Sequence, residues 1–334
     1  MKLFNYIQAS DTSSAIALVL KNPNASFIAG GTTLVDLMKL NVQSPSQLVD
    51  INSLPLTGIE VRPDGVLRIG AMARNSDVAY NSMIKQRYPV VSEAILAGAS
   101  PQLRNMATIG GNLMQRTRCY YFRDTSYPCN KRSPGSGCPA IDGFNRIHAI
   151  LGTSDNCIAT HPSDLCVALS ALDAIVRIKS QKGEREIPIN DFYLVPNDRP
   201  DEENMLEQGE LITAVDIPPL AFASKSGYLK VRDRASYEFA LASAATAIDI
   251  QNNVIRSARI ALGGIATKPW RVKDAEQLLV GTEPTEKSFR SAAELALQNA
   301  KPRQYNKFKV ELAKRTIIRA LITTSTKWNA SSTK

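Results

Sequence analysis

The chain has 334 residues, of which 44% are hydrophobic and 21% are charged, a composition typical of a globular protein with room for two or three domains. Its net charge is +9, but the basic residues are scattered and aromatic residues do not alternate with them, which argues against a nucleic-acid-binding protein. No window approaches about 18 uninterrupted apolar residues and the N-terminus lacks an apolar signal core, so we expect no membrane span and no secretory signal in this chain.

Residues 1–55 predict a small α/β unit, the first of three. In chain order we expect a helix, a strand, a loop, a second helix and a buried strand: SSAIALVL (13–20), SFIA (26–29), GGTT (30–33), LVDLMKL (34–40) and QLVDI (47–51).

Residues 56–222 predict a second unit with an irregular, Cys-rich insert at 116–160. The expected elements are a strand, a helix, a loop, a helix followed by a strand, and a last strand: VLRIGAMA (66–73), VVSEAILAGAS (90–100), RNMATIGGNL (104–113), SDLCVALSALDAIVRIKS (163–180) and GELITAVDIP (209–218). Residues 223–334 predict a C-terminal unit with three strands and then two helices: GYLKVRDR (227–234), FALASAATAIDI (239–250), SARIALGGI (257–265), 285–300 and 306–323.

Two glycine pairs stand at predicted loops, Gly30-Gly31 and Gly110-Gly111. Glycine permits positive φ and lets backbone N–H groups approach an anion closely, so two such loops would suit a pyrophosphate. Further donors lie beside them: Thr32, Thr33, Thr108 and Asn112. The alternative is a pair of tight turns. Neither loop matches the dinucleotide-binding G-x-G-x-x-G pattern or a P-loop.

Four of the five cysteines fall in the irregular insert: Cys119, Cys129, Cys138 and Cys157. Their residues alone leave four alternatives open, namely an iron–sulfur cluster, structural zinc, two disulfides or free thiols. Aromatic residues that could shield a cluster and basic residues that could offset its charge lie among them: Tyr120, Tyr121, Phe122, Tyr127, Arg116, Arg118, Arg123, Lys131 and Arg132.

The remaining cysteine and the two histidines favour structural roles. Cys166 lies on an apolar helix face, where a free cysteine behaves as a small core residue. His148 falls in a strand-like run, HAILG, and His161 precedes a proline and could brace the next turn. Two lone histidines, with no G-x-S-x-G or H-E-x-x-H motif, give little basis for hydrolytic chemistry.

The motifs FIAGGTTL, TIGGNL, HPSDL, GELITAVDIP and KVRDRASYEFALASAA occur in an order similar to that of a known family. The chain resembles the FAD-binding medium subunits of molybdenum hydroxylases, and most of all the iron–sulfur flavoproteins of bacterial periplasmic aldehyde oxidoreductases. The resemblance implies an α+β chain with a two-subdomain FAD-binding fold, of the type of vanillyl-alcohol oxidase, followed by an α+β C-terminal domain.

The resemblance also implies which residues hold FAD. Residues 27–34 would wrap the pyrophosphate, and further contacts would come from three later segments. The implied set is Phe27, Ile28, Ala29, Gly30, Gly31, Thr32, Thr33, Leu34, Thr108, Gly111, Asn112, Ser163, Asp164, Leu211 and Lys230. Lys230 would stabilise negative charge on the reduced flavin. Tyr237 replaces an acidic residue of NAD-using relatives, so an aromatic ring could cover the flavin and NAD use is in doubt.

The resemblance further implies that Cys119, Cys129, Cys138 and Cys157 hold a [4Fe–4S] cluster. The expected function is that of an electron-transfer subunit without catalytic residues of its own. It would join a molybdenum-cofactor large subunit and a [2Fe–2S] small subunit in a heterotrimer that oxidises an aldehyde, and pass electrons to an external acceptor. Export to the periplasm would depend on a partner's signal, and a cytoplasmic complex is the alternative. Two rival functions are a stand-alone FAD oxidoreductase with a zinc-stapled loop and a zinc-containing adaptor.

Overall fold

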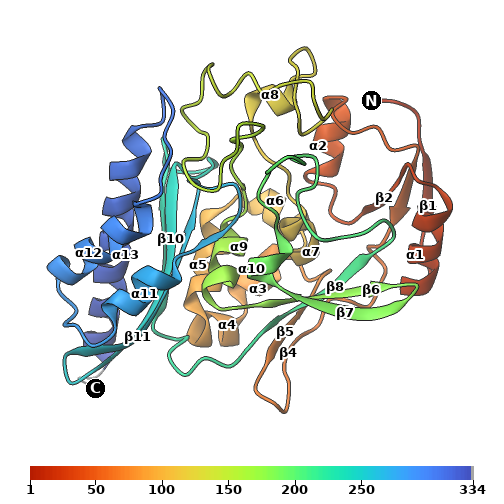
Figure 1. Ribbon diagram of the computed structural model, residues 1–334. Helices are drawn as coiled ribbons and strands as arrows, with labels where there is room; N and C mark the ends of the chain where they lie inside the picture. The colour runs from red at the N-terminus through yellow and green to blue at the C-terminus, as the bar shows by residue number, and fades with distance from the viewer. Residues whose placement is uncertain (332–334) are drawn as a thin grey trace.

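Three separate β-sheets organise the protein (Figure 1). The computed structural model describes residues 1–331, with side chains as far as residue 327. Each sheet lies within one of the predicted units 1–55, 56–222 and 223–334, although the division itself stays a prediction. In the described chain, no helix is both long enough and apolar enough to cross a membrane.

The N-terminal sheet has three parallel strands in the order β1-β3-β2. Two helices connect these strands, and the elements are β1 (Asn5–Gln8), α1 (Thr12–Lys21), β2 (Ala25–Ile28), α2 (Leu34–Lys39) and β3 (Gln47–Asp50). The Asp11 side chain caps α1 by accepting from Ser14 N at 2.8 Å, which satisfies an otherwise unpaired N–H at the helix start. Helix α1 packs its apolar face on the sheet, and α2 follows β2 after the first glycine pair.

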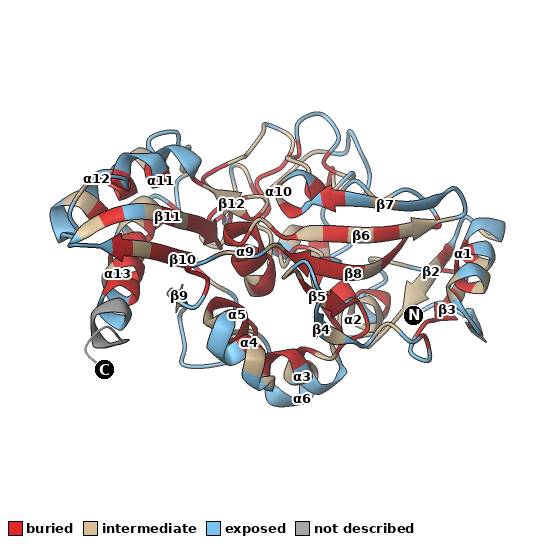
Figure 2. Ribbon diagram, turned by 90° about the horizontal axis from the view of Figure 1, so that it is seen from below, coloured by how far each residue is buried: buried red, intermediate tan, exposed pale blue. Residues whose placement is uncertain are grey.

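The middle sheet is antiparallel, in the order β4-β5-β8-β6-β7. Its strands are β4 (Ile59–Val61), β5 (Leu67–Gly70), β6 (Ile175–Ser180), β7 (Gly183–Pro188) and β8 (Leu211–Ile217). Its associated helices are mostly short and gather beside it: α3 (Asn75–Tyr80), α4 (Ser82–Arg87), α5 (Pro89–Ala97), α6 (Pro101–Met106), α7 (Ile109–Leu113), α9 (Asp164–Ala171) and α10 (Ile189–Phe192). Figure 2 shows buried residues along β5, β6 and β8 and on the helices that face them.

The C-terminal sheet is antiparallel, in the order β12-β11-β10-β9. Three helices pack against it (Figure 1), and the elements are β9 (Ser226–Val231), β10 (Ala242–Gln251), β11 (Val254–Gly263), β12 (Trp270–Arg271), α11 (Lys273–Leu279), α12 (Glu286–Leu297) and α13 (Phe308–Ser331). Apolar residues of β10, β11 and these helices form one core. The helix α13 carries a fully buried lysine, Lys309.

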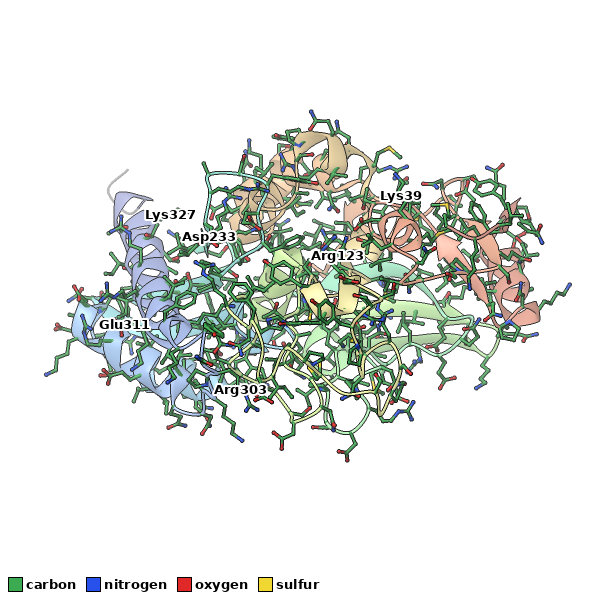
Figure 3. All side chains as sticks on the ribbon, turned by 90° about the horizontal axis from the view of Figure 1, so that it is seen from above. Lys39, Arg123, Asp233, Arg303, Glu311 and Lys327 are labelled. Atoms are coloured by element: carbon green, nitrogen blue, oxygen red, sulfur yellow. The ribbon has the colours of Figure 1, made fainter. Side chains whose placement is uncertain are left out.

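The Cys-rich segment, residues 116–160, is irregular as predicted and contains one helical turn, α8 (Tyr120–Arg123). It crosses the top of the molecule as the yellow chain in Figure 1. Viewed from above, Arg123 of this segment lies between Lys39 of α2 and Glu311 of α13 (Figure 3). Arg118 and Arg123 both bind the carboxylate of Asp36 in α2, at 3.0 and 2.7 Å. The segment is therefore tied to the N-terminal unit directly after the first glycine loop.

Two sequence predictions of local structure were wrong. The predicted loop 104–113 lies mostly within α6 and α7, because Ser100 and Thr108 each cap a short helix. The strand-like run HAILG forms no strand. Its backbone instead makes single contacts, among them Ile150 N with Ile265 O at 2.8 Å. The longer predicted strands and helices were confirmed to within a few residues at their ends, apart from α13, which continues to Ser331.

Candidate functional site

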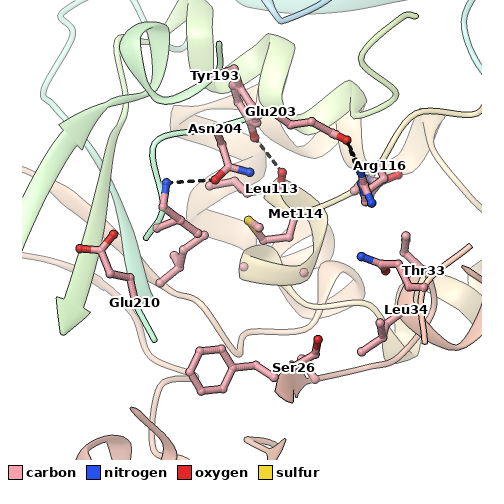
Figure 4. Close-up of a pocket in the computed structure, with 18 of the residues that line it drawn as sticks. Ser26, Thr33, Leu34, Leu113, Met114, Arg116, Tyr193, Glu203, Asn204 and Glu210 are labelled. Carbon is pink, nitrogen blue, oxygen red and sulfur yellow. Dashed lines mark hydrogen bonds and ion pairs between the residues drawn. The ribbon is translucent and has the colours of Figure 1, made fainter. Parts of the chain in front are cut away.

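A cavity of about 670 Å³ lies where the N-terminal unit meets the middle unit. This volume is within the usual range for a site that binds a large organic ligand. Figure 4 shows Thr33 and Leu34 on one side of the cavity. Leu113 at the end of α7, Met114 directly after it and the segment around Glu203 complete the wall. The cavity thus combines both predicted glycine loops with a segment, within residues 201–208, that the sequence had not indicated.

The first glycine loop has an open backbone. A Cβ at residue 30 would lie 1.9 Å from the carbonyl oxygen of Met106, so only glycine allows the loop to approach α6 this closely. Gly31 has φ +68°, which a side chain disfavours. In the described chain, the N–H groups of Gly31, Thr32 and Thr33 have no acceptor. Three unpaired N–H groups at a cavity wall are suited to binding an anionic group.

The second glycine loop is closed by its own hydrogen bonds. The N–H groups of Ile109 and Gly110 donate to the carbonyl oxygens of Ala73 and Ala71, at 3.0 and 2.8 Å. The N–H of Gly111 donates to Thr108 Oγ1 at 3.1 Å. These backbone N–H groups are therefore satisfied within the protein, and α7 contributes shape and side chains to the cavity.

Ten of the fifteen predicted FAD-site residues line this cavity: Phe27, Ala29, Gly30, Gly31, Thr32, Thr33, Leu34, Thr108, Gly111 and Leu211. The other five are not in its lining: Ile28, Asn112, Ser163, Asp164 and Lys230.

The polar residues outside the lining hold one another in place. Ser163 Oγ donates to Asn112 Oδ1 at 2.6 Å, which links the start of α9 to α7. The Lys230 ammonium pairs with the buried Asp164 carboxylate at 2.7 Å. Tyr228 donates its hydroxyl to the same carboxylate at 2.6 Å. Lys230 thus carries a charge that Asp164 already balances.

The far wall of the cavity contains ion pairs that the sequence analysis missed. Arg116 donates from Nε to Glu203 at 2.8 Å, and Lys131 Nζ lies 3.5 Å from the same carboxylate. Burial opposes ionisation of Glu203, but the charges of Lys131 and Arg116 outweigh it and lower the pKa of the carboxyl. Glu203 lies 87 residues from Arg116 in the sequence, so no local pattern could have revealed this pair.

A second, much smaller cavity lies inside the Cys-rich segment. Its lining includes all four predicted ligands: Cys119, Cys129, Cys138 and Cys157. The accessible volume is about 10 Å³, close to the size of one water molecule. All five cysteines of the chain are unpaired, so the alternative of two disulfides is not supported.

The two cavities share part of their walls. Lys131, Cys157 and Ala159 line both of them. The side of the small cavity that carries Cys157 therefore also faces the large one, and a group held by the four thiols would lie directly behind the wall of the large cavity.

The small cavity has the residue types for thiolate ligation, but its volume is too small for an iron–sulfur cluster. Burial raises the pKa of the Cys119 thiol to about 12 and that of Cys138 to about 11. Arg118 Nε and Arg123 Nη1 are buried without a partner among the described residues, and such donors favour added negative charge. No group of three or more His, Cys, Asp or Glu side chains in the described chain is spaced to hold a metal ion. A cluster would therefore require the four thiols to turn and the loops to part.

The remaining sequence predictions concern single residues. Cys166 is fully buried in the core, as predicted, and its sulfur lies 3.0 Å from the Tyr193 hydroxyl. His161 lines the large cavity, and burial lowers its pKa to about 4. Tyr237 is 55% exposed with φ +52°, and it is not in the lining of the cavity.

Comparison with known proteins identifies the family of the chain. Residues 2–220 match the FAD binding domain in molybdopterin dehydrogenase, and residues 227–324 match the CO dehydrogenase flavoprotein C-terminal domain. The chain is 49% identical to the aldehyde oxidoreductase FAD-binding subunit PaoB of Escherichia coli, across 96% of this chain and 98% of that protein. It is 29% identical to the glyceraldehyde dehydrogenase medium chain of Sulfolobus acidocaldarius, across 83% and 81% of the two chains.

Solved structures show the same fold. A chain of quinoline 2-oxidoreductase from Pseudomonas putida 86 superposes with a TM-score of 0.76 at 24% identity, covering 98% of this chain and 99% of that one. The predicted FAD-binding fold with a following C-terminal domain is therefore confirmed. The protein belongs to the FAD-binding subunits of the molybdenum-type oxidoreductases that include aldehyde oxidoreductase and carbon monoxide dehydrogenase.

Proposed function

We propose that this chain is the FAD- and [4Fe–4S]-containing electron-transfer subunit of a molybdenum-dependent aldehyde oxidoreductase. The observation that carries the proposal is the wall of Lys131, Cys157 and Ala159 between the FAD cavity and the cavity of the four cysteines. Electron transfer requires redox groups to lie close together, and this arrangement would bring them together within one chain. The similarity to an aldehyde oxidoreductase subunit supports the substrate class.

Bound FAD and a bound cluster supply the electron chemistry, and the protein supplies placement and tuning. The open N–H groups of Gly31, Thr32 and Thr33 bind the diphosphate. The loop side chains and Leu211 exclude water from the apolar part of the cavity. The Lys230 ammonium and the Asp164 carboxylate form an ion pair at the start of α9. The hydrogen bond from Ser163 to Asn112 lies next to it in the chain.

Four cysteines, Cys119, Cys129, Cys138 and Cys157, are the ligands of the cluster in this proposal. The thiols must lose their protons to bind metal. Arg118 and Arg123 lie in the same segment and would offset the resulting negative charge, since each has a buried N–H without a partner in the described part of the chain. All four cysteines line the same small cavity, which is the observation that favours them as one ligand set.

The proposal includes partners. A large subunit would hold the molybdenum cofactor and a small subunit would hold [2Fe–2S] clusters, giving a heterotrimer that delivers electrons through this chain to an external acceptor. Several relatives are named medium chains or medium subunits, which supports a place in a multi-subunit enzyme. We place the complex in the periplasm by export with a partner, and fractionation of cells that express the whole complex would test this location.

Metal content of cysteine variants tests the proposal. Each of the four ligands is changed to serine in anaerobically purified protein, and iron, zinc and flavin are measured per chain. We expect each variant to lose most of its iron. Cys166→Ser is the matched control, because Cys166 is fully buried but lies outside the small cavity, and it should retain iron. Iron that persists in all four variants would contradict the ligand set. Zinc with FAD and no iron would favour the stand-alone FAD oxidoreductase with a zinc-stapled loop. The other rival function, a zinc-containing adaptor, has no support because the chain belongs to an FAD-binding family.

A further inference from the structure

One histidine in the wall of the large cavity has a ring nitrogen without a partner. His161 lines the cavity between Thr160 and Pro162. Its backbone is held in place by the N–H, which donates to the carbonyl oxygen of Ala266 at 3.1 Å. The Nε2 atom of its ring is buried and has no hydrogen-bond partner among the described residues. A buried polar atom of this kind calls for an explanation, and in a cavity wall a ligand atom can supply the partner.

The other ring nitrogen of His161 shows where the proton of the ring lies. Nδ1 accepts a hydrogen bond from the backbone N–H of Ser163 at 3.3 Å. A backbone N–H can only donate, so Nδ1 carries no proton. Burial lowers the pKa of His161 to about 4, so the ring is neutral near pH 7 and holds one proton. That proton is therefore on Nε2, and the unpartnered nitrogen is a donor.

The protein groups beside the ring do not accept this proton. The Tyr193 ring packs edge-on against that of His161, with 4.5 Å between the ring centroids, and its hydroxyl donates to the carbonyl oxygen of Leu113 at 3.0 Å (Figure 4). The Glu203 carboxylate is close enough for its charge to act on His161, but Arg116 binds it at 2.8 Å. The Nε2 proton therefore remains available for an acceptor that a ligand brings into the cavity.

The kind of acceptor follows from the charge of the ring. A neutral imidazole offers one N–H and no positive charge, which suits an uncharged oxygen or nitrogen atom. The diphosphate of FAD has other donors, namely the open N–H groups of Gly31, Thr32 and Thr33 in the first glycine loop. The rest of FAD carries carbonyl oxygens, hydroxyl groups and ring nitrogens, and the cavity has the volume for a large organic ligand.

We propose that His161 binds FAD by donating a hydrogen bond from Nε2 to an uncharged acceptor atom of the cofactor, while its Nδ1 holds Ser163 at the start of α9. This inference rests on the FAD-binding part of the proposed function and needs no metal in the small cavity. One side chain then has two separable roles, because one nitrogen serves the cofactor and the other serves the fold.

Two substitutions separate these roles. His161→Asn places an acceptor near the position of Nδ1 and removes the donor to the cavity. His161→Gln extends an amide N–H to the position of Nε2 and removes the acceptor. Titration of the deflavinated full-length chain with FAD gives the affinity, and chemical denaturation shows whether each variant is folded.

We expect His161→Asn to bind FAD about tenfold more weakly than the wild type, because it loses one hydrogen bond to the cofactor. His161→Gln should bind FAD within about threefold of the wild type, although it loses the bond to Ser163. A purely structural role would weaken His161→Gln at least as much as His161→Asn, and that result would overturn the inference.

A measurement on the wild type makes the test independent of the folding of the variants. The chain has two histidines, so isotope labelling of histidine gives nuclear magnetic resonance signals from two imidazole rings only. His148 is not in the lining of the large cavity and serves as the internal reference. We expect added FAD to move the Nε2 proton signal of His161 downfield and to leave the His148 ring unchanged.

Two results would overturn the inference and leave the proposed function intact. FAD could bind without moving the His161 signal, which would show that Nε2 does not reach the cofactor. Pyrophosphate alone could move the signal as far as FAD does, which would show that the acceptor is the charged diphosphate. A folded wild-type chain that takes up no FAD would contradict the inference and the proposed function together.

Discussion

The two glycine pairs are alike in sequence and differ in what their backbones do. At Gly30-Gly31 the close approach to Met106 and the positive φ leave three successive N–H groups without an acceptor in the described residues. At Gly110-Gly111 the corresponding N–H groups donate to Ala71 and Thr108. The first loop therefore presents open N–H groups that suit an anion, whereas the N–H groups of the second loop hold α7 in place within the protein. A glycine pair thus indicates that the backbone lies close to another group. Only the hydrogen bonds of its N–H groups show whether that group belongs to the protein or is left for a ligand.

The largest expected effect comes from Gly30→Val. The new Cβ would overlap the Met106 carbonyl, which belongs to the backbone and cannot turn away. We expect the free energy of unfolding to fall by about 3 kcal/mol or more. Chemical denaturation followed by circular dichroism measures this change. An unfolding free energy within about 0.5 kcal/mol of the wild type would show that the first glycine loop does not lie against Met106.

Gly31→Val should weaken FAD binding while the chain remains folded. The positive φ is strained for a β-branched residue, so the loop should rotate and its N–H groups should lose their alignment. Losing about 2 kcal/mol of charge-assisted hydrogen bonding corresponds to about 30-fold weaker FAD binding. Titration of the deflavinated protein with FAD gives the affinity, and unfolding data show whether the chain remains folded. Unaltered affinity would mean that the first loop does not bind the diphosphate.

Thr108→Ala tests the structural role of the second loop. The variant loses the cap that Thr108 Oγ1 provides to the Gly111 N–H, so the unfolding free energy should fall by about 1 kcal/mol. Thr108→Ser keeps the oxygen and should recover most of the loss. Because the second loop has no open N–H groups, the effect on FAD affinity should be smaller than that of Gly31→Val. A larger loss of FAD affinity in Thr108→Ala than in Gly31→Val would contradict this difference between the two loops.

Gly111→Ala should have the smallest effect. Its φ is not positive, and a Cβ would meet only Thr108 Oγ1, at 3.0 Å. We expect a change in unfolding free energy within about 0.5 kcal/mol and retention of FAD. A loss of flavin comparable to that of Gly31→Val would show that the second loop also binds the anion through its backbone.

Much of the fold was predictable because it depends on local patterns. Apolar periodicity located the long strands and helices, and the motifs identified both glycine loops and the four cysteines. The short helices α6 and α7 were missed because capping residues, not periodicity, define them. The ion pair of Arg116 with Glu203 was missed because the two residues are distant in sequence. Only the folded chain shows that the two cavities share a wall.

The most direct test of the proposed function is the cofactor content of the wild-type chain after anaerobic purification with its partners present. An absorption spectrum with flavin, iron and zinc measured per chain is sufficient. The account predicts one FAD and about four irons per chain. FAD with no iron, in protein shown to be folded, would contradict the metal centre and leave a flavoprotein whose four buried cysteines serve another purpose.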